Sequence, residues 1–76
     1  MDLEVFPNPA RNSINVNHSI AEQGAKMQVF GINGQLLMTK TVPENAFLTT
    51  IDISNLAAGP YVLVYLNGTD KKAIRF

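Results

Sequence analysis

His18 is the single histidine of this 76-residue chain, and Ser19 follows it directly. An imidazole beside a hydroxyl could begin a nucleophilic site, because the imidazole can accept the proton of the attacking hydroxyl. A working triad also needs a group that orients the histidine and an oxyanion hole, and neither has a sequence signature here. We therefore expect His18 to be an ordinary surface residue at the end of a strand.

The carboxylates are the other candidates for catalysis or metal binding. No pair of them has the spacing of an acid/base pair or of a calcium loop; they are Asp2, Glu4, Glu22, Glu44, Asp52 and Asp70. Asp52 with Ser54 and Asn55 offers several oxygen atoms, but such short polar side chains more often make turns and caps. With no cysteine, a structural zinc site is nearly excluded. The sequence predicts no enzyme, no metal and no cofactor.

Half of the six basic residues lie in the last six positions, 71–76. In a strand, alternate side chains share a face, so one face would carry Lys72, Ile74 and Phe76 and the other Lys71, Ala73 and Arg75. Charges of this kind protect an exposed sheet edge from aggregation. The segment could instead be a terminal basic-apolar signal that a partner reads. From the physics alone, edge protection is favoured.

Six basic residues balance six acidic ones, and charged residues make up 16% of the chain, against roughly 25% in typical soluble domains. This balance argues against a nucleic-acid or anionic-membrane surface, which needs clustered cations. No apolar run approaches the ~20 residues of a membrane helix, and no signal peptide opens the chain. The length suits one domain, which we interpret as a segment of a larger protein.

Short apolar stretches separated by turn signals predict an all-β fold. Period-two alternation, or an unbroken apolar run, predicts strands at 3–6, 13–18, 26–30, 35–42, 47–53, 61–66 and 71–76. About seven antiparallel strands without a long helix are typical of a small immunoglobulin-like β-sandwich. The stretch 61–66 is apolar throughout, so we expect it to be covered on both faces or central in its sheet.

Proline and glycine positions predict the connections. Pro7-Asn8-Pro9 should stop the first strand, because neither proline has a backbone N–H to donate. Asn33-Gly34 predicts a type I′ hairpin turn, since both residues tolerate positive φ. Over 54–59 we expect a single helical turn that Ser54 caps and that Gly59 ends in the left-handed conformation.

Four segments together carry a resemblance to a known family: VFPNPARNSINV, VFGINGQLL, IDISNLAAGPYVLVY and KKAIRF, in this order. The whole chain, 1–76, resembles the C-terminal sorting domain of proteins exported by the type IX (Por) secretion system of Gram-negative bacteria. No single segment is specific, but the ordered set of four is. The positions that match the family motifs are Pro7, Asn8, Pro9, Gly34, Leu56, Gly59 and Tyr61.

The resemblance implies a non-catalytic secretion signal that follows an N-terminal cargo domain. The cargo would pass through the periplasm, and the domain would direct it across the outer membrane through the type IX translocon. A sortase-like surface peptidase would then cut before Leu3, remove the domain and anchor the cargo at the cell surface. In this interpretation the last strand, Lys71-Lys72-Ala73-Ile74-Arg75-Phe76, is read by the translocon or the peptidase, while the glycines and Tyr61 serve the fold.

Other functions remain open from the residues. An adhesion or carbohydrate-binding β-sandwich would present aromatic side chains on one exposed face, whereas Tyr61 and Tyr65 fall in the most apolar strand. A structural accessory domain of a secreted enzyme cannot be told from a sorting signal by sequence physics. A free terminal strand would also allow two domains to form a homodimer through their edges.

Overall fold

The computed structural model describes residues 3–7 and 12–76. These residues form seven strands and no helix: β1 (Glu4–Phe6), β2 (Ser13–Asn17), β3 (Lys26–Gly31), β4 (Leu36–Thr41), β5 (Leu48–Asp52), β6 (Tyr61–Asn67) and β7 (Asp70–Arg75). Each strand begins and ends within one residue of the predicted bounds. The predicted all-β fold is confirmed, and the arrangement is consistent with an immunoglobulin-like sandwich.

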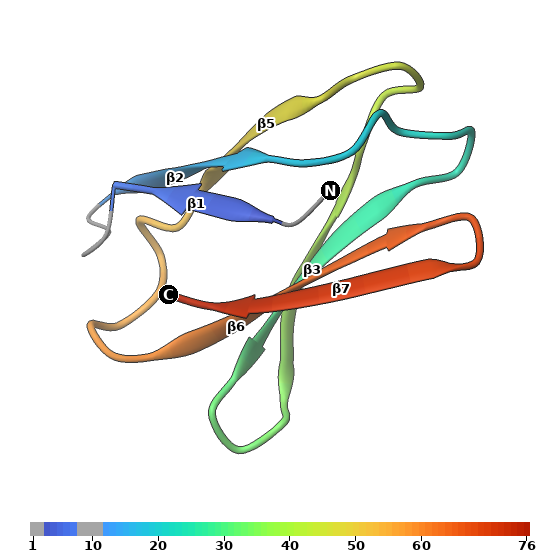
Figure 1. The fold of residues 1–76 in the computed structure, drawn as a ribbon. Helices are drawn as coiled ribbons and strands as arrows, with labels where there is room; N and C mark the ends of the chain where they lie inside the picture. The colour runs from blue at the N-terminus through green and yellow to red at the C-terminus, as the bar shows by residue number, and fades with distance from the viewer. Residues whose placement is uncertain (1–2, 8–11) are drawn as a thin grey trace.

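Two antiparallel sheets make up the sandwich (Figure 1). The first has three strands in the order β1-β2-β5, and the second has four in the order β4-β3-β6-β7. β6 therefore lies between two strands, as its unbroken apolar sequence predicts. β7 lies at the edge of its sheet, as its charges predict.

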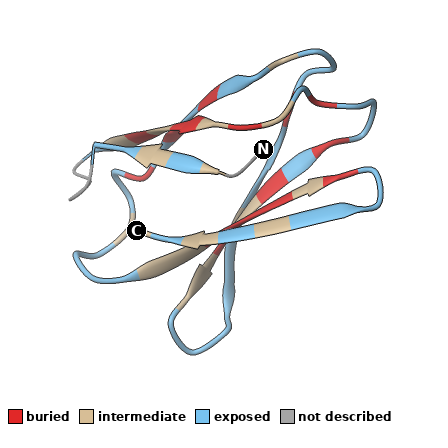
Figure 2. Ribbon diagram, in the orientation of Figure 1, coloured by how far each residue is buried: buried red, intermediate tan, exposed pale blue. Residues whose placement is uncertain are grey.

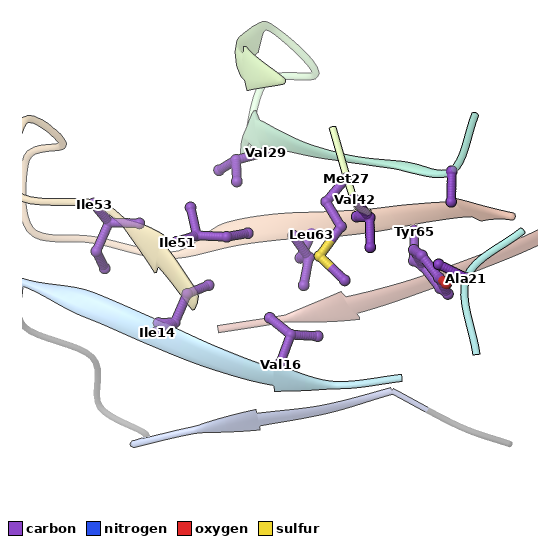
Figure 3. Close-up of a cluster of buried hydrophobic side chains, with 11 residues drawn as sticks. Ile14, Val16, Ala21, Met27, Val29, Val42, Ile51, Ile53, Leu63 and Tyr65 are labelled. Atoms are coloured by element: carbon purple, nitrogen blue, oxygen red, sulfur yellow. The ribbon is translucent and has the colours of Figure 1, made fainter. Parts of the chain in front are cut away.

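The core lies between the sheets and follows from the alternation within each strand (Figures 2 and 3). Ile14 and Val16 of β2 point toward Leu63 of β6, and all three side chains are fully buried. Every second side chain faces inward, so one apolar cluster forms, which consists of Ile14, Val16, Ala21, Ala25, Met27, Val29, Val42, Ile51, Ile53, Leu63 and Tyr65. Burial of this apolar surface is the main stabilising contribution in a chain without disulfides.

His18 is not a surface residue, and that prediction is wrong. Its side chain is fully buried, with Nε2 2.7 Å from Oγ1 of Thr49 and Nδ1 2.8 Å from the carbonyl oxygen of Ser19. The Ser19 carbonyl can only accept, so Nδ1 carries the proton and Nε2 accepts from the Thr49 hydroxyl. The alternation of Ile14 and Val16 continues inward to position 18, beyond the end of β2, and there the imidazole finds two polar partners.

The β3–β4 hairpin forms where predicted, but its turn is not type I′. Gly34 has a φ of 88°, whereas Asn45 is the one described non-glycine residue with positive φ, so Asn33 lacks the φ that type I′ requires. The N–H of Gly34 donates to the carbonyl of Gly31 at 2.9 Å. Oδ1 of Asn33 accepts from the N–H of Gln35 at 3.1 Å, which favours this longer loop.

No helical turn forms over 54–59, all of which the structure describes. The N–H of Leu56 donates to the carbonyl of Ile53 at 2.9 Å, which closes a β-turn. The N–H of Ser54 donates to Oδ1 of Asp52 at 2.9 Å, so Asp52, not Ser54, supplies the acceptor. Gly59 has a φ of 149°, far from the left-handed helical value of about 57°. Here turn chemistry prevails over helix capping.

Candidate recognition strand at the sheet edge

β7 is hydrogen-bonded to β6 on one side, and no other described strand pairs with it (Figure 1). Its side chains, with that of the following Phe76, form two rows, as the alternation predicts. The half-buried inner row consists of Lys72, Ile74 and Phe76, and the exposed outer row of Lys71, Ala73 and Arg75. Within the inner row, Ile74 and Phe76 pack against the core. The strand is therefore held by apolar contacts on one face only.

The free edge of β7 exposes a regular set of backbone groups. Tyr61 and Phe76 exchange both backbone hydrogen bonds, at 2.9 and 3.0 Å, so they form a hydrogen-bonded pair. Such pairs alternate along an antiparallel ladder with pairs whose N–H and C=O groups point outward. By the β6–β7 register, the outward-pointing groups belong to the outer row, Lys71, Ala73 and Arg75. These three residues thus present both their side chains and their backbone to the surroundings.

Tyr61 ties the end of β7 to the preceding loop. Its ring stacks on that of Phe76 with the centroids 5.8 Å apart and 29° between the planes. Its hydroxyl donates to the carbonyl of Ala57, and Leu56 in the same loop is half-buried against the core. The structure thus brings together two motif positions, Leu56 and Tyr61, beside the last residue of the candidate strand.

The other motif positions lie elsewhere. Gly34 is in the β3–β4 turn, and Gly59 is in the loop before β6. Pro7 follows β1 directly, so the first strand stops where predicted, and the Phe6–Pro7 peptide bond is cis. Asn8 and Pro9 lie outside the described residues.

A comparison with protein families decides what kind of domain this is. The family model of the secretion system C-terminal sorting domain matches residues 4–76. The chain belongs to this family. This sorting domain is a C-terminal signal for type IX secretion, and it implies interaction with that machinery and with an N-terminal cargo region. It also implies export to the outer membrane, the cell surface or the medium. No curated protein matches the chain significantly.

Sorting domains of this family are generally non-catalytic. Nδ1 of His18 contacts the carbonyl oxygen of Ser19 and not the Ser19 hydroxyl, while Nε2 contacts the buried hydroxyl of Thr49. Within residues 3–7 and 12–76, no three His, Cys, Asp or Glu side chains cluster as metal ligands. The same residues include no helix that is long and apolar enough to span a membrane.

Two buried polar residues that support the loop before β3 were not predicted from the sequence. One is His18, and the other is Asn67, which is 5% exposed. Oδ1 of Asn67 accepts from the N–H of Glu22 at 2.7 Å, and its Nδ2 donates to the carbonyl of Ile20 at 3.0 Å. Asn67 continues the inward alternation of Leu63 and Tyr65, which is the signal that could have revealed it.

Proposed function

We propose that this sorting domain is the C-terminal part of a larger secreted protein and that the translocon reads the last six residues, Lys71 to Phe76, which comprise most of β7 and the following Phe76, by strand addition. In strand addition, an extended segment of a partner pairs with an exposed sheet edge, and backbone hydrogen bonds supply much of the affinity. The observation that carries the proposal is the free edge of β7. There the outer row directs three N–H and three C=O groups away from β6.

The other edges suit strand addition less well. β1 has three residues, which limits a partner to few backbone bonds. β4 has a register shift near its start, and Nζ of Lys40 donates to the carbonyl of Thr50 at 2.8 Å, so this side chain lies across both the β4 edge and the β5 edge. A shifted register and a side chain across the edge both hinder a new strand. β7 has six residues with a continuous register.

We further infer the fate of the cargo from family membership. The cargo crosses the periplasm, and the domain then directs it through the outer-membrane translocon. A sortase-like peptidase at the surface removes the domain by a cut before Leu3 and anchors the cargo. Membership in the sorting-domain family supports this sequence of events.

Export of a reporter tests the proposed function. Residues 3–76 are fused to the C-terminus of a fluorescent protein that carries a periplasmic signal peptide, in a host with type IX machinery. We expect fluorescence outside the outer membrane for this fusion, and periplasmic fluorescence both for the reporter alone and for a fusion that lacks 71–76. If the full fusion stays in the periplasm, the sorting function is wrong. If the truncated fusion is exported equally well, β7 is not the part that is read.

A further inference from the structure

The outer face of the four-stranded sheet carries many apolar side chains for a face that no described strand covers. The β3–β4, β3–β6 and β6–β7 registers place six apolar side chains on it, namely Phe30, Leu36, Val62, Val64, Leu66 and Ala73. Val64, at the centre, is 7% exposed and is not part of the core cluster, while Leu36 at the β4 edge is 47% exposed. Val62, Val64 and Leu66 follow one another along β6 as an apolar strip, and the polar side chains on the same face, Gln28, Thr39 and Thr41, belong to β3 and β4.

The charged side chains that the described strands place on this face are all positive. Lys26 of β3 and Lys71 of β7 lie on either side of Leu66, and Arg75 lies beside Val62. The described carboxylates lie elsewhere: Glu4 and Asp52 are on the outer face of the three-stranded sheet, Glu22 and Glu44 are in loops, and Asp70 alternates inward. Although the chain has equal numbers of basic and acidic residues, this face therefore carries a local positive charge. We call these nine residues, the six apolar ones with Lys26, Lys71 and Arg75, the basic apolar face.

The outer face of the three-stranded sheet provides an internal comparison. Its central strand β2 presents Ser13, Asn15 and Asn17, and neighbouring β5 presents Thr50 and Asp52. Polar outward side chains of this kind are normal for an antiparallel sheet that faces water. Apolar exceptions on this face are confined to its flanking strands, at Phe6 and Leu48. The two sheets thus differ in the way expected if only the four-stranded one is covered by a partner.

We propose that the basic apolar face is a docking surface for a protein of the export machinery. The matching surface of that protein has an apolar centre with carboxylates around it. The proposal rests on the proposed function and deepens it. Lys71 and Arg75 belong both to this face and to the free edge of β7. A partner whose strand adds beside β7 would therefore lie directly next to this face, so that one partner can contact both the edge and the face.

The charge and burial of this face favour a different protein as the partner over a second copy of the domain or a membrane. A second copy that met this face through the same residues would place Lys26, Lys71 and Arg75 of both copies together, and like charges across an interface are costly. Membrane-binding faces insert protruding apolar side chains among the lipids. Here Leu36 protrudes at the β4 edge, but the central Val64 is buried and its neighbours Val62 and Leu66 are half-buried, which suits a flat protein partner better.

Photo-cross-linking tests the proposal during export of the reporter fusion. A photoreactive amino acid at Gln28, beside Val64, should trap a protein of the machinery, and the same group at Thr50 on the other sheet should not. Outcomes at Gln28 that would overturn the proposal are a second copy of the domain, lipid alone, or no adduct in cells that export the fusion. A wild-type fusion that is not exported would instead overturn the proposed function.

A double substitution outside β7 separates this face from the edge strand. Lys26→Glu with Phe30→Thr should lower the export rate about tenfold or more, because it reverses one charge and removes apolar contact. The control, Lys40→Glu with Leu48→Thr, reverses one lysine and removes one apolar side chain away from this face, and it also removes the hydrogen bond from Lys40 to Thr50; export of a folded control should stay within about twofold. Equal export of both variants would contradict the proposal. Thermal unfolding of both purified domains shows whether each variant is folded. If either variant is unfolded, the cross-linking experiment at Gln28 tests the proposal in its place.

Discussion

At the scale of single residues, the main finding is a buried polar pair in a small core. The Thr49 hydroxyl donates to Nε2 of His18, and the His18 ring lies 4.6 Å from the Tyr65 ring. The Tyr65 hydroxyl donates to the carbonyl of Ser19 at 2.9 Å, the same carbonyl that accepts from His18. These bonds hold the chain after β2 against β5 and β6 without leaving a described buried side-chain polar atom unpaired.

Removal of the Thr49 hydroxyl should therefore be costly. Thr49→Val keeps the shape but leaves Nε2 of His18 buried without a donor, so we expect a loss of about 1–3 kcal/mol in the free energy of unfolding. Thr50→Val is the matched control, because its hydroxyl bonds the exposed side chain of Asn15; there we expect less than about 0.5 kcal/mol. Denaturant titration of the isolated domain measures both. Equal losses in the free energy of unfolding would show that the buried hydrogen bond between Thr49 and His18 stabilises the fold no more than an exposed one.

Asp52 gives the domain a defined response to acid. Hydrogen bonds from the backbone N–H and then the side chain of Ser54 hold the pKa of this carboxyl below its ordinary value. A carboxylate whose pKa is lower in the folded state stabilises the fold above its unfolded pKa, and this contribution is lost as the pH falls through the folded pKa. The melting temperature should therefore fall less in Asp52→Asn than in wild type between pH 7 and about pH 3. A wild-type melting temperature that falls no more than that of Asp52→Asn would refute this role.

At the scale of elements, the strands were predictable and the turns were not. Strands follow from the alternation of apolar side chains, as in Ile14 and Val16, and this signal is set by which face each residue must bury. The two turns depended on finer chemistry. The general preferences of Asn33 and Ser54 predict a type I′ turn and a helix cap. In each turn, however, a side-chain oxygen accepts a hydrogen bond from the backbone N–H two residues further on, and this bond favours a different geometry. Local hydrogen bonds of this kind have no period that a sequence reveals.

The β3–β4 turn offers a direct test of its observed form. Gly34→Ala should destabilise the domain by about 1–2 kcal/mol, since an alanine at a φ of 88° is strained. Asn33→Gly should also destabilise it, by about 0.5–1 kcal/mol or more, because it removes the acceptor for Gln35 and adds backbone freedom. A type I′ turn would instead tolerate glycine at both positions. The unfolding free energy of Asn33→Gly decides between these turn types, because Gly34→Ala is strained in both.

At the scale of the whole molecule, the sandwich has one core and two dissimilar outer faces. The sequence predicted the fold class, the edge position of 71–76 and the central position of 61–66. It could not reveal that Lys26, Lys71 and Arg75 converge on one face, because that depends on strand order and register between distant segments. The candidate site is predictable where it is continuous in sequence, as in β7, and not where it is assembled across the sheet.

The basic apolar face should make recognition sensitive to salt. Its three cations surround an apolar centre. Binding to a surface with carboxylates would therefore combine charge attraction, which salt screens, with apolar contact, which salt does not screen. We expect the yield of the Gln28 adduct in permeabilised cells to fall as ionic strength rises, but not to vanish. A yield that does not depend on salt would indicate that the cations take no part.

The central claim is that the translocon reads the free backbone edge of β7, and one ratio tests it most directly. Ala73→Pro removes an N–H that points away from β6, so it breaks no bond within the domain but denies one to an added strand. Ala73→Thr changes the same side chain and keeps the N–H. We predict that the secreted fraction of the reporter falls at least about tenfold for Ala73→Pro relative to Ala73→Thr, while both domains melt as folded proteins. Equal secretion of the two would contradict recognition through this edge.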